Sequence, residues 1–170
     1  VHPTLVPFDH MLASVNGVFN AAMVRGDMVG DTMFYGRGAG RLPTASTVVG
    51  DIGDIARNMA HGEVRYARAV PTYGEGVTKL RAPGDIVSRF YLRFNVADKA
   101  GAFGTMTTIL GRNGVSISAA AQKTANVDEK GFVPVVVLTH PAPAKAVDAA
   151  LAEIREAGIL NESPVKLRML

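Results

Sequence analysis

The stretch Gly36-Arg37-Gly38-Ala39-Gly40 is the part of the chain whose residue types could place a bare backbone against a phosphate-bearing cofactor. It follows a strand-like run and precedes a helix-like one. The third glycine at dinucleotide-binding spacing and a parallel strand–helix–strand context are both missing, so the fingerprint is weak. For Gly36 we favour a structural role, a tight glycine turn that leads into the helix.

The remaining polar residues do not form a pattern typical of metal binding. The four histidines are scattered, with no two at helical metal-binding spacing, and we expect His10 beside Asp9 to make a local turn contact. The chain has no cysteine, which excludes disulfides, thiolate catalysis and cysteine-ligated zinc and fits a cytoplasmic location. We therefore predict no metal site.

Length and composition limit the possible partners. The chain has 170 residues, 48% of them hydrophobic, which allows one domain or two small ones with a buried core. Its formal net charge is only +3, and its basic residues are scattered. No apolar run reaches the length of a membrane span, and no signal segment is present. We therefore expect neither a nucleic-acid partner nor a membrane partner.

The elements that position these residues are clearest in the second half of the chain. Apolar residues alternate over 90–96, recur at helical spacing over 103–110, and alternate again over 115–121, with Asn113-Gly114 where the helix should end. This order is strand, helix, strand.

The pattern continues with a β-branched strand over 132–140, an amphipathic helix over 147–154 and a last strand over 165–169. The whole predicts an α+β fold with a ferredoxin-like βαββαβ order, in which a four-stranded antiparallel sheet has both helices on one face.

The first 60 residues do not resemble a complete domain. A short extended piece over 1–7 precedes a hairpin of strands 18–24 and 28–35, and helical spacing follows over 48–59. A hairpin plus one helix cannot bury both faces of a sheet. We therefore expect a partial α+β segment of a larger domain, and a chain that begins at Val1 as a fragment of a longer protein.

The run YLRFNVADKAGAFGTMTTILGRNGVSI resembles an ACT domain, the regulatory module of amino-acid-metabolising enzymes. Ala100 stands where that family commonly has proline, and Phe103 where it commonly has leucine. The resemblance implies an amino-acid effector bound where two such modules meet, at Asp98, Ala100, Gly101 and Ser116. Gly101 permits close approach, the first helical turn suits a carboxylate, and Asp98 suits an ammonium group. The alternative is that Asp98 only caps the turn and Gly101 only relieves strain.

The runs VHPTLVPFDHMLASVNGVFNAAMV and MFYGRGAGRLPTASTVVGDIGDIARN are similar to the end of the catalytic region of homoserine dehydrogenase. The resemblance implies an NAD(P)-dependent oxidoreductase that interconverts aspartate semialdehyde and homoserine, is inhibited by threonine and forms a dimer. It also implies that Gly40 contacts the NADP or NAD cofactor in the intact enzyme.

In that family the nucleotide-binding domain and the catalytic lysine and aspartate lie upstream of the position of Val1. We therefore expect this chain alone to contain no catalytic residue, to bind no cofactor and to be inactive.

Three regions are expected on this basis: the remnant of the catalytic region over 1–60, a linker over 61–87 and the ACT domain over 88–170. Two alternatives remain. The same βαββαβ order occurs in RNA-binding RRM domains, and Lys130-Gly131-Phe132-Val133 begins like their aromatic motif, but the further aromatics and a basic stripe are missing. The absent proline at Ala100 suggests instead a dimerisation module with a vestigial ligand site.

Overall fold

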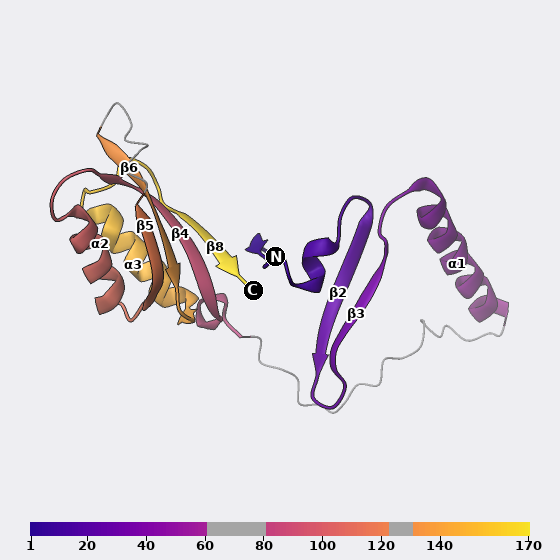
Figure 1. Ribbon diagram of the computed structural model, residues 1–170. Helices are drawn as coiled ribbons and strands as arrows, with labels where there is room; N and C mark the ends of the chain where they lie inside the picture. The colour runs from indigo at the N-terminus through magenta and orange to yellow at the C-terminus, as the bar shows by residue number, and fades with distance from the viewer. Residues whose placement is uncertain (61–80, 123–130) are drawn as a thin grey trace. The chain divides into compact units, whose positions relative to one another are not determined.

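The computed structural model describes residues 1–60, 81–122 and 131–170 (Figure 1). The chain divides into two compact units, one made of Val1–Val6 with Leu80–Leu170 and the other of Pro7–Lys79. Most of the predicted linker, 61–80, lies outside the described residues.

The larger unit has the predicted βαββαβ order, and its four strands pair antiparallel in the order β8-β4-β6-β5. The α+β prediction is therefore confirmed. The elements are β4 (Val87–Ala97), α2 (Ala102–Arg112), β5 (Ile117–Gln122), β6 (Phe132–Thr139), α3 (Ala144–Glu156) and β8 (Val165–Met169).

One face of this sheet carries the core. Alternate residues of β4 and β6 are buried, and the covering helices α2 and α3 lie on the same side of the sheet in Figure 1. Both helices turn an apolar stripe inward, as their periodicity predicts. The largest buried side chains are Phe90, Phe94, Leu92, Met106, Leu110 and Ile154.

Both helices of this unit end as their glycines predict. After α2, Gly114 adopts a φ of +74°, and the Val115 amide donates to the Leu110 carbonyl at 2.9 Å. This bond delays the next strand, so β5 begins at Ile117 rather than at the predicted Val115. Gly158 follows α3 with a φ of +65°.

Three short elements extend the larger unit. The helical turn η2 (Pro83–Asp85) precedes β4, and β7 (Ala142–Pro143) pairs with the first residues of β4. Lys145 Nζ lies 2.8 Å from Asp85 Oδ1, and this hydrogen bond lowers the pKa of Asp85. The third is β1 (Thr4–Leu5), which pairs parallel with β8 at the edge of the sheet.

The smaller unit contains the turn η1 (Met11–Ser14), the hairpin of β2 (Phe19–Gly26) and β3 (Gly30–Arg37), and the helix α1 (Arg41–Ala60). The predicted hairpin is present and antiparallel. Arg25 donates two hydrogen bonds to Asp31 across it, at 2.5 and 2.9 Å, and they lower the pKa of Asp31.

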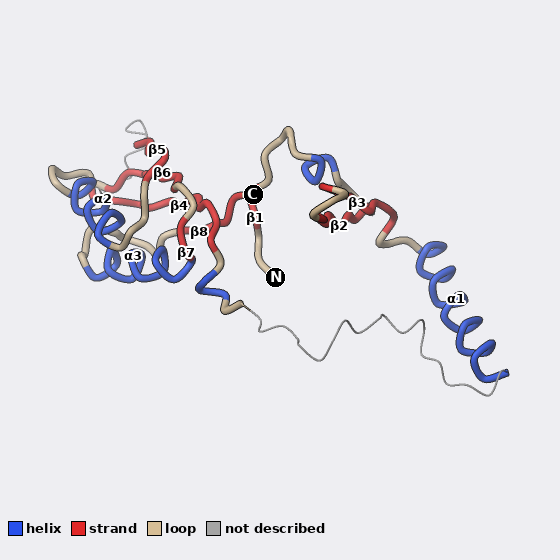
Figure 2. The backbone as a smooth tube through the Cα atoms, turned by 90° about the horizontal axis from the view of Figure 1, so that it is seen from below, coloured by secondary structure: helices blue, strands red, loops and turns tan. Residues whose placement is uncertain are grey.

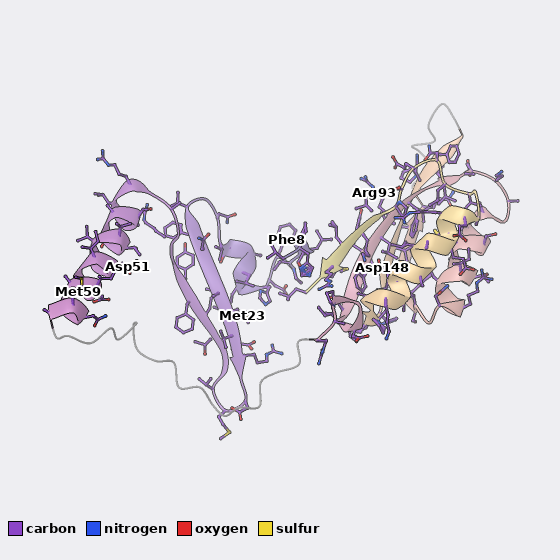
Figure 3. All side chains as sticks on the ribbon, turned by 180° about the vertical axis from the view of Figure 1, so that it is seen from behind. Phe8, Met23, Asp51, Met59, Arg93 and Asp148 are labelled. Carbon is purple, nitrogen blue, oxygen red and sulfur yellow. The ribbon has the colours of Figure 1, made fainter. Side chains whose placement is uncertain are left out.

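No residue between Pro7 and Ala60 is buried. Apolar side chains are instead exposed on all of its elements, as the side chain of Met59 on α1 illustrates in Figure 3. Those more than half exposed include Phe8, Met28, Val29, Phe34, Leu42, Val49, Ile52, Ile55 and Met59. Such a surface requires a partner to cover it.

Replacing Leu92 by alanine is expected to lower the free energy of unfolding by about 2 to 5 kcal/mol, because Leu92 is 0% exposed and its truncation leaves a cavity. Ile55→Ala in α1 is the matched control. That side chain is 59% exposed, so its truncation should change stability by less than about 0.5 kcal/mol. Urea denaturation followed by circular dichroism measures both. Equal losses would show that α1 has an intramolecular partner.

Candidate effector site

The turn between β4 and α2 brings three of the four expected effector residues together. Asp98 directly follows β4, and its amide donates to the Gly131 carbonyl at 2.9 Å. Ala100 and Gly101 complete the turn, and all three residues are exposed. The helix begins at Ala102, with the Thr105 amide bonded to the Gly101 carbonyl at 2.8 Å.

Gly101 has a backbone conformation that favours glycine. It is the N-cap of α2 with a φ of 88° and a ψ of −20°, in the left-handed region. An added Cβ would meet no atom within 4 Å, so the conformation rather than crowding requires glycine here. The open side of Gly101 leaves the first-turn amides of α2 accessible to a small anion.

The carboxylate of Asp98 makes no side-chain hydrogen bond to another residue in the described ranges, so the described contacts give it no capping role in the turn. A carboxylate at the start of a helix whose own amides attract an anion presents charges of both signs within a short distance. This is the charge arrangement that a zwitterionic α-amino acid requires.

Ser116 lies at the opposite end of the sheet. Its carbonyl accepts the His140 amide at 2.9 Å, just beyond the end of β6, whereas Asp98 lies beside the beginning of β6. The eight residues of β6 therefore separate the two, roughly 25 Å at the usual rise per residue. Within one chain the structure does not bring Ser116 to the other three residues.

The strand that follows Ser116 is an open edge of the sheet. Among the described residues β5 pairs only with β6. Each residue from Ser118 to Gln122 is exposed, and the strand sequence ISAAAQ contains no charge and no proline. Natural sheets usually protect a free edge with charged residues or proline. This edge is therefore suited to pairing with another strand.

The glycine-rich stretch owes its glycines to local geometry. An added Cβ on Gly38 would lie 1.6 Å from the Asn20 side-chain nitrogen, so the Asn20 side chain would have to move. Gly40 has a φ of +124° and directly precedes α1. The prediction of a turn at Gly36 is wrong. Gly36 lies inside β3, where it pairs with Asn20 of β2, and the strand pairing continues to Arg37.

Gly40 has some, but not all, of the features of a cofactor-binding glycine. Its bare backbone lies at the N-terminus of a twenty-residue helix, next to Arg41, and both features suit a phosphate. The described residues of this unit form no parallel strand–helix–strand arrangement around it. Gly40 therefore suits a single contact with a cofactor held mainly by other residues.

Within residues 1–60, 81–122 and 131–170, no group of acidic and histidine side chains is arranged to hold a metal ion. In the same ranges no helix is both long and apolar enough to cross a membrane.

Two family models match the chain. Residues 1–52 match the homoserine dehydrogenase model, and residues 90–156 match the ACT domain model. The chain is similar to homoserine dehydrogenases. The ACT match begins in β4 and ends with α3, so it contains the turn at Asp98 and favours the ACT interpretation over the RRM alternative.

Homoserine dehydrogenases match along almost the whole chain. The Neisseria gonorrhoeae protein is 39% identical over 99% of this chain, and the Mycobacterium bovis protein is 42% identical over 92% of it. The crystal structure of the Thiobacillus denitrificans enzyme superposes with a TM-score of 0.80 and 32% identity. It covers 99% of this chain. This chain spans 39% of the Neisseria relative and 38% of the Thiobacillus chain.

The two exposed glycines at the start of α2 should respond to alanine in opposite ways. Gly101→Ala is expected to destabilise the protein by about 1 to 2 kcal/mol, because alanine is strained at a positive φ. Gly104→Ala, inside the helix, is expected to stabilise it by about 0.5 to 1 kcal/mol. Neither new methyl group meets an atom within 4 Å. Thermal and urea denaturation compare the two, and equal signs would contradict the backbone argument.

Proposed function

We propose that this chain is the C-terminal regulatory portion of a homoserine dehydrogenase, and that its ACT domain senses an amino acid, with threonine as the effector. The parent enzyme interconverts L-aspartate 4-semialdehyde and L-homoserine with NAD(P) in the cytoplasm. The observation that carries this proposal is that a homoserine dehydrogenase segment and an ACT domain occur in one chain, with relatives that match along both.

The effector site is completed by a second copy of the chain. Since β4 and β5 both run antiparallel to β6, they run parallel to each other, and Ser116 starts β5 at the end of the sheet far from Asp98. If two β5 edges pair antiparallel about a twofold axis, the start of one β5 lies beside the end of the other. Ser116 of the second copy then approaches the Asp98 turn of the first.

Each expected site residue has a separate task in binding the effector. The Asp98 carboxylate pairs with the α-ammonium group, and the first amides of α2, left accessible by Gly101, donate hydrogen bonds to the α-carboxylate. The hydroxyl of Ser116 from the second copy both donates and accepts, which suits the hydroxyl of threonine. Ala100 contributes backbone to the turn.

The chemical step belongs to the parts of the parent enzyme outside this chain. The nicotinamide cofactor, when bound, gives or accepts the hydride. Gly40 at the start of α1 is the residue of this chain proposed to touch it, and no catalytic residue is assigned here. The 170-residue chain alone is therefore expected to be inactive.

A second candidate is a module that only dimerises. The uncharged β5 edge favours pairing whether or not a ligand binds. Calorimetric titration separates the candidates, because a dimer without effector heat is a structural module and a dimer with effector heat is a sensor.

Asp98→Asn is expected to abolish the heat of threonine binding, because an amide no longer compensates the α-ammonium charge. Asp85→Asn is the matched control. It removes an exposed carboxylate of the same unit, before the beginning of β4, and should leave binding unchanged. Isothermal calorimetry with threonine and a panel of other amino acids measures both. Full binding by Asp98→Asn would show that this carboxylate does not hold the effector.

Ala120→Lys on β5 is expected to convert the dimer into a monomer and to abolish threonine binding with it, because the edge then carries a charge and the site loses the second copy's Ser116. Ala152→Lys adds the same charge at an exposed position of α3 and should change neither. Analytical ultracentrifugation gives the mass of each variant. A monomeric Ala120→Lys variant that still binds threonine fully would contradict the shared site.

A further inference from the structure

The sheet of the larger unit includes one strand, β1, from the segment that matches the homoserine dehydrogenase model. Thr4 pairs with Arg168 and Leu5 with Met169, in parallel register, and the Leu170 amide donates to the Leu5 carbonyl at 3.0 Å. Figure 2 shows β1 beside the end of β8. Residues 4 and 5 lie within the homoserine dehydrogenase match, whereas β8 follows the ACT match.

This pairing has the features of a weakly held strand. It includes only two residues of β1, and both are exposed, Leu5 by 40%. It therefore depends on a few main-chain hydrogen bonds and buries little apolar surface. Short contacts of this kind open locally without unfolding of the domain.

The position of β1 in the chain links it to the smaller unit. β1 ends two residues before Pro7, where the smaller unit begins, and the chain returns to the larger unit at Leu80, ahead of β4. In the sheet β8 lies between β1 and β4. Both ends of the smaller unit are thus attached to one sheet, and release of β1 frees one of them.

Main-chain contacts join the end of β4, next to the Asp98 turn, to the segment that precedes β8. The Ala97 amide, next to Asp98, donates to the Ile159 carbonyl at 2.9 Å, and Val96 forms a bridge with Leu160. Residues 159 and 160 lie in the connection from α3 to β8. A ligand that orders the Asp98 turn therefore also orders the segment that leads into β8.

We infer that β1 is a releasable strap, whose docking on β8 is favoured when an amino acid occupies the Asp98 turn. This inference rests on the proposed effector site and adds the element that the effector controls. A ligand that prefers the docked state raises its population, and by reciprocity a strap held in place raises the affinity for the ligand. The strap is then the connection through which the ACT sheet restrains the smaller unit.

The absence of cysteine from the chain makes a direct test possible. Leu5, Met169 and Arg89 form one row across β1, β8 and β4. Leu5→Cys with Met169→Cys places two thiols on adjacent strands, within disulfide reach. Leu5→Cys with Arg89→Cys is the matched control, since two strand spacings, about 10 Å, exceed that reach.

Under mild oxidation the first variant is expected to form the disulfide and the control not to form it, and threonine is expected to accelerate formation at least threefold. Calorimetry then compares the oxidised and reduced forms of the first variant. The oxidised form is expected to bind threonine at least threefold more tightly, because no binding energy is used to dock the strap. Thr4→Cys with Arg168→Cys repeats the test at the neighbouring pair if the first variant folds poorly.

The outcomes separate the strap from the effector site. Equal affinity in the oxidised and reduced forms, or weaker binding when oxidised, overturns the strap and leaves the sensing function intact. Equally fast disulfide formation in the control overturns the docked position of β1, and the strap with it. No heat with any amino acid in either form overturns both proposals.

Discussion

The antiparallel pairing of β4 with β6 is the constraint on which the rest of the larger unit depends. It runs from Tyr91 opposite Leu138 to Ala97 opposite Phe132, and it places both buried rows on one face for α2 and α3 to cover. At one end the buried Thr139 hydroxyl accepts the Phe90 amide at 2.9 Å. At the other end the same pairing fixes the Asp98 turn beside Gly131.

The periodicity of the sequence predicted the long elements that bury one face and expose the other. β4, α2 and α3 each repeat an apolar pattern over several turns or pleats, so their existence and order could be read from residue types. The extended piece over 1–7 was predicted, but the pairing of β1 with β8 was not, because two exposed residues have no period and their partner lies more than 160 positions away. The error at Gly36 has a similar cause, since the ladder of β3 continues through it to Arg37. There the stacked rings of Phe19 and Tyr35, 4.9 Å apart, support the hairpin.

The candidate site was predictable in part. The types and local order of Asp98, Ala100 and Gly101 suffice to place them in one turn, because they are neighbours in the chain. The position of Ser116 depends on the direction of β5 relative to β4, which residue types do not encode. Strand direction separates Ser116 from the turn, which is why the proposed site takes Ser116 from a second copy.

The occupation of the β8 side by β1 has a consequence for how copies of this chain assemble. A sheet with two free margins can add neighbours on both sides and grow into a filament, whereas a sheet with one free margin stops after a single pairing. β1 pairs with Arg168 and Met169, the last two of the five residues of β8, so among the described residues this margin offers a shorter free edge than β5 does. Two residues of main chain thus shorten the second edge at which the sheet could add a neighbour.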